Sequence, residues 1–273
     1  MKEKFYTDFS VKRSISQDWQ MEDVHFHDLF EIYYSFTNNI KYLIDGKLYA
    51  VNRGDLFIFN NKELHKIIVP ADIKYERYVL IFNPALVQDL STKRTNLLEF
   101  FLNRSKDFRN KVQLDDIQEQ KLLDLFKKAE QYSKTNQYGY DIYTRTILAE
   151  ILLLINSFYR NYSYRTLHTE DEDYNRIKPV ITYIHDNYDK KLSVQKIAAE
   201  FNLSSYHLGY LFKKATGFSI YDYIINLRII KAKDLLREQI AVSKVCELVG
   251  FGSYSNFIRT FSKRVGISPG QYS

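Results

Sequence analysis

Residues 192–219 read LSVQKIAAEFNLSSYHLGYLFKKATGFS, and this stretch decides the fold of the C-terminal part. Apolar side chains recur at helical spacing on both sides of the Asn202-Leu203 pair. Ser193 and Ser204 stand where serine caps the first turn of a helix, and Gly217 stands where glycine ends one. The stretch therefore predicts a short helix, a tight turn and a second helix.

The same pattern recurs further along the chain. A long helix is expected after Ser219, followed by a short helix near residues 245–249, a turn at residues 250–252 and a helix capped by Ser253. Upstream of the turn the two units are 48 residues apart, and downstream they are 49 apart, so the second turn is one residue longer. The downstream matches are Phe212 with Phe261, Lys214 with Lys263, Gly217 with Gly266, Ser219 with Ser268 and Tyr223 with Tyr272.

The positive charge lies in this repeated part. Residues 174–273 contain 15 Lys and Arg against 7 Asp and Glu, a net charge of +8, whereas residues 1–173 contain 24 against 26, a net of −2. A basic domain suits a polyanion reader, although a merely soluble basic surface explains the charge alone equally well. In a helix-turn-helix the second helix enters the major groove, so two units on one rigid helix could reach successive grooves about 34 Å apart.

The repeated part resembles the AraC/XylS family of bacterial transcription regulators over roughly its last hundred residues. The resemblance rests on residues 192–204 and 211–219, on the R-x-x-x-A-x-x-L-L pattern of residues 228–236, on VGFGS at residues 249–253 and on Ser268-Pro269. It implies promoter DNA and RNA polymerase as partners and a homodimer, and activation is the family's more frequent mode. We expect no enzymatic activity and no cofactor.

The resemblance also implies which side chains face DNA. Arg259 and Asn256 are the better readers, because Arg can pair with guanine and Asn with adenine through two hydrogen bonds each. Lys213, Lys214, Lys263 and Arg264 are expected to contact phosphate or remain solvated. For every position the alternative is a solvated helix face. The predicted DNA-binding set is Ser205, Tyr206, Gly209, Tyr210, Lys213, Tyr254, Ser255, Asn256, Arg259 and Lys263.

The N-terminal part changes to short β-rich segments. Asp45-Gly46 is a strong two-residue hairpin signal, and Arg53-Gly54-Asp55 is a second turn. Many short strands with close turns predict a sandwich or barrel. The expected strands are residues 30–36, 41–45, 47–51, 56–59, 65–69 and 75–82.

Residues 20–85 resemble the cupin-type sensor of sugar-responsive members of the same family. Two amphipathic helices are expected at residues 114–132 and 140–159. The second could form an intersubunit seam or simply cover the barrel, and its apolar residues are Ile142, Ile147, Leu148, Ile151, Leu152 and Ile155. The predicted fold is thus an α+β two-domain chain. It has a cupin-like barrel with dimerisation helices at residues 1–160, a linker at 161–173 and an all-α double helix-turn-helix domain at 174–273.

Four residues of the predicted barrel have the spacing of a metal-binding cupin. His25, His27, Glu31 and His65 could hold a divalent ion, hydrogen-bond an effector, or be structural. The glycines that usually flank that motif are missing, so we expect no metal. Trp19 could stack on a sugar or fill the core. The predicted effector-binding set is therefore Trp19, His25, His27, Glu31 and His65, with a sugar as the expected effector.

Composition excludes several other classes. A single cysteine, Cys246, rules out an intramolecular disulfide and a cysteine-based zinc cluster. No segment approaches the roughly 20 apolar residues that cross a bilayer, and residues 1–10 lack the apolar region of a secretory signal. We therefore expect a cytoplasmic protein without a membrane partner. The alternatives are a metal-dependent cupin enzyme with an accessory DNA-binding domain, and a regulator that responds to a fatty acid or to no ligand.

Overall fold

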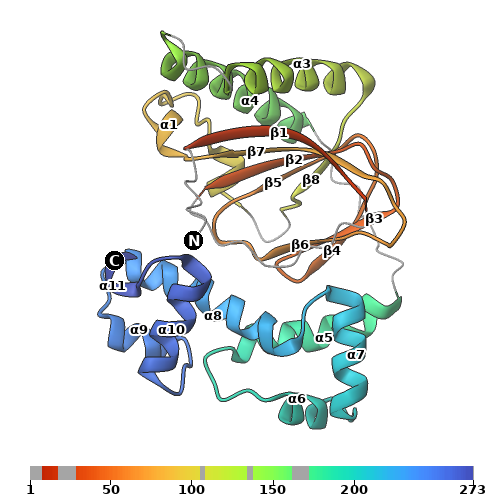
Figure 1. Ribbon diagram of the computed structural model, residues 1–273, viewed down its shortest axis with the longest axis vertical. Helices are drawn as coiled ribbons and strands as arrows, with labels where there is room; N and C mark the ends of the chain where they lie inside the picture. The colour runs from red at the N-terminus through yellow and green to blue at the C-terminus, as the bar shows by residue number, and fades with distance from the viewer. Residues whose placement is uncertain (1–7, 18–28, 105–107, 134–137, 162–171, 273) are drawn as a thin grey trace.

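The computed structural model describes residues 8–17, 29–104, 108–133, 138–161 and 172–272 (Figure 1). The N-terminal part contains two antiparallel sheets, with strand orders β1-β7-β2-β5-β8 and β4-β3-β6. An aromatic core fills the space between them. The strands are β1 (Phe9–Ser16), β2 (Phe30–Ser35), β3 (Ile40–Ile44), β4 (Lys47–Val51), β5 (Asp55–Phe59), β6 (His65–Ile68), β7 (Tyr75–Phe82) and β8 (Lys111–Gln113).

The six strands expected from the sequence correspond to β2 through β7. Asp45 and Gly46 form the β3–β4 turn with φ of 43° and 77°, the left-handed pair that a two-residue hairpin requires. The strands β1 and β8 were not predicted. They form the two edges of the larger sheet, where β1 pairs with β7 and β8 pairs with β5.

Helices cover the larger sheet on the side away from the smaller one (Figure 1). They are the short α1 (Ala85–Gln88) and α2 (Glu99–Leu102), and the long α3 (Asp116–Ser133) and α4 (Tyr140–Asn161). The proposed intersubunit seam on α4 is largely buried within the chain itself. Ile147, Leu148, Ile151, Leu152 and Ile155 are at most 6% exposed and pack in the core under the sheet, so of the six apolar residues only Ile142 remains exposed. That stripe therefore covers the barrel.

All the described secondary-structure elements of the C-terminal part are helices. Its helices are α5 (Glu172–Asn187), α6 (Val194–Glu200), α7 (Ser205–Thr216), α8 (Ile220–Arg237), α9 (Val242–Leu248), α10 (Tyr254–Val265) and α11 (Pro269–Tyr272). Most of the linker expected at residues 161–173 lies outside the described residues, but Glu172 and Asp173 already belong to α5. The two-domain α+β prediction is confirmed.

The helix boundaries follow the capping residues of the sequence. The side chains of Ser193, Ser204, Ser219 and Ser253 each accept a hydrogen bond from a backbone N–H in the first turn of α6, α7, α8 and α10. Gly217 and Gly266 end α7 and α10 in the left-handed conformation. These local signals place both recognition helices, α7 and α10, at the positions that the repeat predicts.

Equivalent residues of the two units make the turn. Asn202 and Gly250 both have positive φ, 53° and 77°. At Gly250 a Cβ atom would lie 2.3 Å from the carbonyl oxygen of Asp189, so only glycine fits where the second turn meets the loop after α5. Asn tolerates the left-handed region in the first turn, where the sequence has no glycine.

The two parts of the chain share a core. Leu43 and Leu48 of the smaller sheet, and Leu64 just before β6, are buried in one apolar cluster with the first helix-turn-helix unit. The β3–β4 turn sits directly on α5, since a Cβ at Gly46 would lie 2.7 Å from Ile181 Cγ2. The Tyr174 hydroxyl donates to the Gly46 carbonyl at the same place. The barrel therefore docks on the first unit through its smaller sheet (Figure 1).

Candidate nucleic-acid interface and effector site

Helix α10 is strongly two-sided. Phe257 and Phe261 are fully buried in the core of the second unit. Tyr254, Ser255 and Arg259 are exposed, and Asn256 is half-buried. The serine cap fixes the first turn, and these polar side chains all lie in the N-terminal half of the helix. In helix-turn-helix proteins the N-terminal residues of the second helix contact the bases.

Asn256 and Arg259 are in direct contact one helical turn apart. Arg259 Nη2 donates a hydrogen bond to Asn256 Oδ1 at 3.2 Å, and the Thr260 hydroxyl donates to the same oxygen at 3.4 Å. Asn256 N donates to Ser253 Oγ at 3.4 Å. The structure thus brings together the two side chains that the sequence ranked as the better base readers.

Helix α7 presents a different chemistry. Tyr206 and Tyr210 are 87% and 58% exposed. Ser205 and Gly209 each precede one of these tyrosines and are half-buried, and a Cβ added at Gly209 would meet no atom within 4 Å. The predicted DNA-facing surface of the first unit is therefore aromatic and uncharged until Lys213, near the end of the helix.

Both units are fixed to α8. Arg228 on α8 donates from Nε and Nη2 to the carbonyls of Tyr188 and Lys190, which precede α6. Asp222, in the first turn of α8, forms an ion pair with Arg264 of α10 at 2.8 Å. Apolar side chains of α8 enter the cores of both units. The long helix therefore holds the recognition helices in one relative orientation.

The four predicted phosphate-contacting cations divide into two pairs. Lys214 forms an ion pair with Asp173 at 2.7 Å, and Arg264 forms the one with Asp222. Lys213 and Lys263 are exposed, and neither has an ion pair with another described residue. Lys213 and Lys263 can therefore meet phosphate without breaking an ion pair to another described residue.

The predicted effector-binding set is described only in part. Trp19, His25 and His27 lie outside the described residues. Glu31 and His65 lie together, with Oε2 and Nε2 3.7 Å apart and side chains 10% and 12% exposed. The His65 ring stacks on Phe59 with centroids 4.2 Å apart, and its Nδ1 donates to the Glu63 carbonyl at 3.0 Å. That bond directs Nε2 to Glu31.

Two tyrosines face the same space between the sheets. The rings of Tyr33 and Tyr42 cross edge to face, with centroids 5.2 Å apart, and the Tyr42 ring also meets His65 at 6.0 Å. Burial raises the pKa of Tyr33 to about 12, and burial together with the charge of Glu31 raises that of Tyr42. Both phenols stay protonated at neutral pH, so the enclosed polar groups offer hydroxyl donors beside a carboxylate and an imidazole.

The metal hypothesis gains nothing from the described residues. Among them, no three His, Cys, Asp or Glu side chains are grouped closely enough to hold an ion. Glu31 and His65 are two of the four ligands considered, and the other two lie outside that part of the chain. The ion pair between Glu31 and His65, and the hydrogen bond of His65 to the Glu63 carbonyl, account for the positions of these two side chains.

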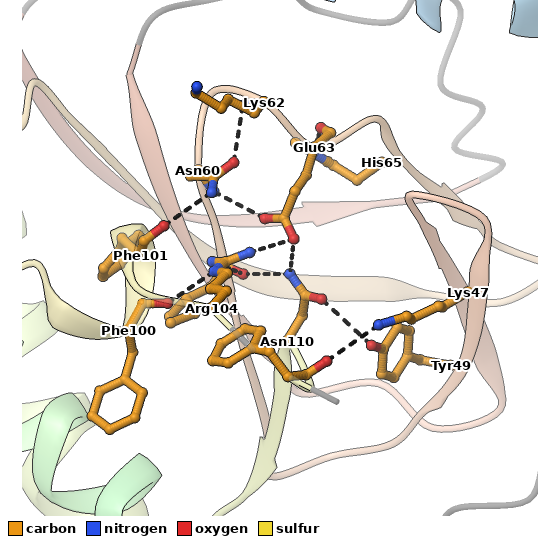
Figure 2. Close-up of polar contacts among 12 residues, drawn as sticks. Lys47, Tyr49, Asn60, Lys62, Glu63, His65, Phe100, Phe101, Arg104 and Asn110 are labelled. Carbon is orange, nitrogen blue, oxygen red and sulfur yellow. Dashed lines mark hydrogen bonds and ion pairs between the residues drawn. The ribbon is translucent and has the colours of Figure 1, made fainter. Parts of the chain in front are cut away.

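A polar network that the sequence did not predict joins the loop after β5 to Arg104 and Asn110 (Figure 2). Glu63 forms an ion pair with Arg104 and accepts from Asn110 Nδ2 at 2.8 Å and from Asn60 N at 3.1 Å. Asn60 Nδ2 donates to the Phe101 carbonyl at 2.9 Å. The sequence signal was slight, a polar run at residues 60–63, and nothing in it indicated the partners more than 40 residues away.

The Glu31–His65 pair should make stability depend on pH. Burial lowers the pKa of His65, but the nearby carboxylate of Glu31 and the hydrogen bond to the Glu63 carbonyl outweigh it, so the pKa is raised overall. A raised folded-state pKa stabilises the fold below the unfolded value of about 6.5, and this contribution is lost as pH rises through the folded value.

We therefore expect the difference in unfolding free energy between wild type and His65→Gln to shrink as pH rises from about 6 to about 8. Urea titrations at a series of pH values measure it. A difference that stayed constant over this interval would show that the pair does not titrate there.

Two protein families match this chain, one over the β-rich N-terminal part and one over the helical C-terminal part. Residues 7–152 match the AraC-like ligand binding domain family, and residues 197–273 match a helix-turn-helix domain family. The chain belongs to the AraC family of transcriptional regulators. No helix of the described residues is long and apolar enough to span a membrane.

Individual relatives agree with this assignment. YfiF of Bacillus subtilis, an uncharacterized HTH-type transcriptional regulator, is 25% identical over 254 residues, which cover 91% of this chain and 78% of YfiF. YobQ of the same organism is 38% identical over 96 residues, 34% of this chain and 39% of YobQ. The match to YtdP spans 24% of that longer protein.

Solved structures are similar in part. ToxT from Vibrio cholerae, with unsaturated fatty acid bound, is 14% identical over 97% of this chain and 95% of its own, with a TM-score of 0.40. The DNA-binding domain of AdpA in complex with target DNA is 23% identical over 36% of this chain and 88% of its own, with a TM-score of 0.34.

Proposed function

We propose that this chain is a sequence-specific activator that binds promoter DNA in the cytoplasm and responds to a small effector, most simply a sugar. The observation that carries the DNA-binding half is the Asn256–Arg259 pair in the N-terminal half of a capped helix. Arg and Asn are the side chains that read guanine and adenine in the major groove. A helix that presents both in a fixed geometry suits base readout.

The two recognition helices, α7 and α10, are proposed to make different kinds of contact with DNA. The second would read bases through Asn256 and Arg259, assisted by Tyr254 and Ser255. The first would contact thymine methyl groups or the sugar-phosphate backbone through Tyr206 and Tyr210, with Ser205 and Gly209 allowing close approach. Aromatic rings without charge favour apolar and shape contacts over hydrogen-bonded base readout.

Lys263→Ala tests the proposed phosphate contact. Because a phosphate contact carries no sequence information, we expect affinity to fall to a similar degree for specific and unrelated DNA, and the slope of log affinity against log salt to decrease by about 1. Fluorescence anisotropy over a salt series measures both quantities. Lys93→Gln, a change of an exposed lysine between α1 and α2, serves as the control. A slope equal to that of wild type would exclude a phosphate contact at Lys263.

The effector half of the proposal rests on the enclosed polar groups between the sheets. Glu31, His65, Tyr33 and Tyr42 combine hydrogen-bond donors and acceptors with aromatic faces. Trp19, His25 and His27 complete the proposed set from outside the described residues. Sugars are bound by this combination of polar groups and ring faces, whereas a fatty acid chain would call for an apolar lining.

Thermal-shift screening of the full chain against neutral sugars and fatty acids tests the effector. A sugar that raises the melting temperature of wild type but not of Glu31→Gln would support the proposal. Stabilisation by fatty acids alone would replace the sugar by the alternative effector. A chain that binds promoter DNA strongly but is stabilised by no compound would be a regulator without a ligand.

A homodimer and a contact with RNA polymerase belong to the same proposal. The apolar side chains left exposed on α3 and α4 include Ile117, Ile142, Tyr143 and Leu153, each at least half exposed. This outer side of the helix pair, opposite the buried stripe, is the proposed intersubunit surface. Sedimentation of wild type and Ile142→Glu would show whether the surface is used.

A further inference from the structure

The two helix-turn-helix units touch each other at a joint beside the middle of α8. On the side of the first unit, the joint is formed by the loop of residues 188–190, which leads from α5 toward α6. On the side of the second unit it is formed by Gly250-Phe251, in the turn between α9 and α10. A Cβ atom at Gly250 would lie 2.3 Å from the carbonyl oxygen of Asp189, so the two backbones are in close contact.

Arg228 of α8 occupies this joint and contacts both of its sides. Its Nε donates to the Tyr188 carbonyl at 2.8 Å, and its Nη2 donates to the Lys190 carbonyl at 2.7 Å. The guanidinium also lies over the Phe251 ring, 5.7 Å from the ring centroid. Arg228 and Phe251 are both buried. One side chain therefore connects the loop of the first unit, the long helix and the turn of the second unit.

A second polar link joins the units at the first turn of α8. Asp222 pairs with Arg264 of α10 at 2.8 Å, and the Ser219 hydroxyl donates to the other carboxylate oxygen of Asp222 at 2.7 Å. Asp222 and Arg228 are about 9 Å apart along the helix axis, because each helical residue rises about 1.5 Å. Two separated links resist rotation of one unit against the other, whereas a single link would act as a pivot.

Apolar packing holds the units to α8 but is less sensitive to direction. Different faces of the helix enter the two cores, with Tyr223 and Leu227 in the first unit and Ile225 and Ile229 in the second. The hydrophobic effect is non-directional. Hydrogen bonds weaken steeply when their geometry is distorted. The polar contacts of the joint are therefore the part of the interface that responds most to a change in the angle between the units.

We propose that Arg228 is a positioning residue, which sets how many base pairs must separate the DNA segments read by α7 and α10. The inference rests on the proposed function, in which both helices enter the major groove. One inserted base pair moves the second segment by about 3.4 Å along the DNA axis and rotates it by about 34°. A joint that holds the two helices at one distance and one rotation therefore rejects operators of the wrong spacing.

The arginine fork suits this role. Nε and Nη2 belong to one planar group, so they donate in fixed directions to two carbonyls that lie two residues apart in the loop. Lysine has the same charge and a flexible stem, but its ammonium lacks the rigid fork. Arg228→Lys therefore keeps the charge of the DNA-binding domain and loosens the joint.

The test measures affinity for DNA as a function of the spacing between the two segments. Footprinting on the upstream intergenic DNA locates the segments, and duplexes are then made with one base pair inserted or removed between them. Fluorescence anisotropy is measured with the full chain as wild type, Arg228→Lys and the matched control Arg237→Lys. Arg237 lies further along the same helix, where it bonds to Asp234 and Tyr272.

We expect wild type and Arg237→Lys to prefer the natural spacing over an altered one on the order of tenfold, the value of one lost bidentate base contact. In Arg228→Lys this preference should be about three times smaller, the effect of one lost hydrogen bond. Partial unfolding lowers the active fraction equally for every duplex and leaves the ratio of affinities unchanged. The ratio therefore separates positioning from stability.

A spacing preference in Arg228→Lys equal to that of wild type would overturn the positioning role. The role would also be overturned by a wild type that prefers its operator over a scrambled duplex but binds every spacing equally well. Equal affinity of wild type for operator and scrambled duplexes is a different result, because it would contradict sequence-specific binding itself and this inference with it.

Discussion

Arg259→Ala is expected to weaken binding to specific promoter DNA by about 1 to 3 kcal/mol while leaving binding to unrelated DNA nearly unchanged. The side chain is exposed, and its hydrogen bond to Asn256 holds it beside the second proposed reader. Loss of the guanidinium removes a two-bond pairing with guanine, and the discrimination at that base pair should relax.

Gel-shift titrations on the upstream intergenic DNA and on a scrambled duplex of equal length measure this effect. Arg94→Ala, an exposed arginine outside the DNA-binding domain, is the matched control. Equal losses on both duplexes would mean that Arg259 contacts phosphate, and no loss on either would mean that its helix face is solvated.

Asp55→Ala should lower the free energy of unfolding by about 3 to 5 kcal/mol. Asp55 is fully buried and Oδ2 lies 2.6 Å from Nζ of Lys111, which is itself 6% exposed. The same carboxylate oxygen accepts from Asn52 N in the turn before β5. Removing the carboxylate leaves the ammonium of Lys111 enclosed, with the Ala50 carbonyl as its one hydrogen-bond acceptor among the described residues.

The double substitution Asp55→Leu with Lys111→Met should recover most of that loss. Burial raises the pKa of Asp55 even with Lys111 beside it, so the attraction does not fully offset the desolvation of the pair. Urea denaturation of the single and double variants measures both values. A double variant as unstable as Asp55→Ala would show that the turn hydrogen bond, and not the unpaired charge, dominates.

The sequence predicted most where the signals are local. The serine caps, Gly217 and Gly266 define α7 and α10, and the Asp45-Gly46 pair defines a hairpin, because each acts within one turn of its own backbone. The pairing of Asn256 with Arg259 follows from their spacing on one helix.

What the sequence did not predict depends on long-range contacts. The edge strands β1 and β8 are recognised only by the neighbours that they pair with, β7 and β5. The apolar stripe of α4 is compatible with an interface or a core until the sheet beneath it is seen. Likewise, the sequence gives no sign that Lys214 pairs with Asp173 until α5 is in place beside α7.

Footprinting on the upstream DNA tests the central claim most directly. Hydroxyl-radical cleavage and guanine methylation protection, with wild type and Arg259→Ala, would locate each recognition helix. We predict two protected major-groove segments about one helical turn, or 10 to 10.5 base pairs, apart, with guanine protection in one of them lost in Arg259→Ala. Uniform, salt-sensitive protection that is the same for both proteins would contradict sequence-specific reading by the paired units.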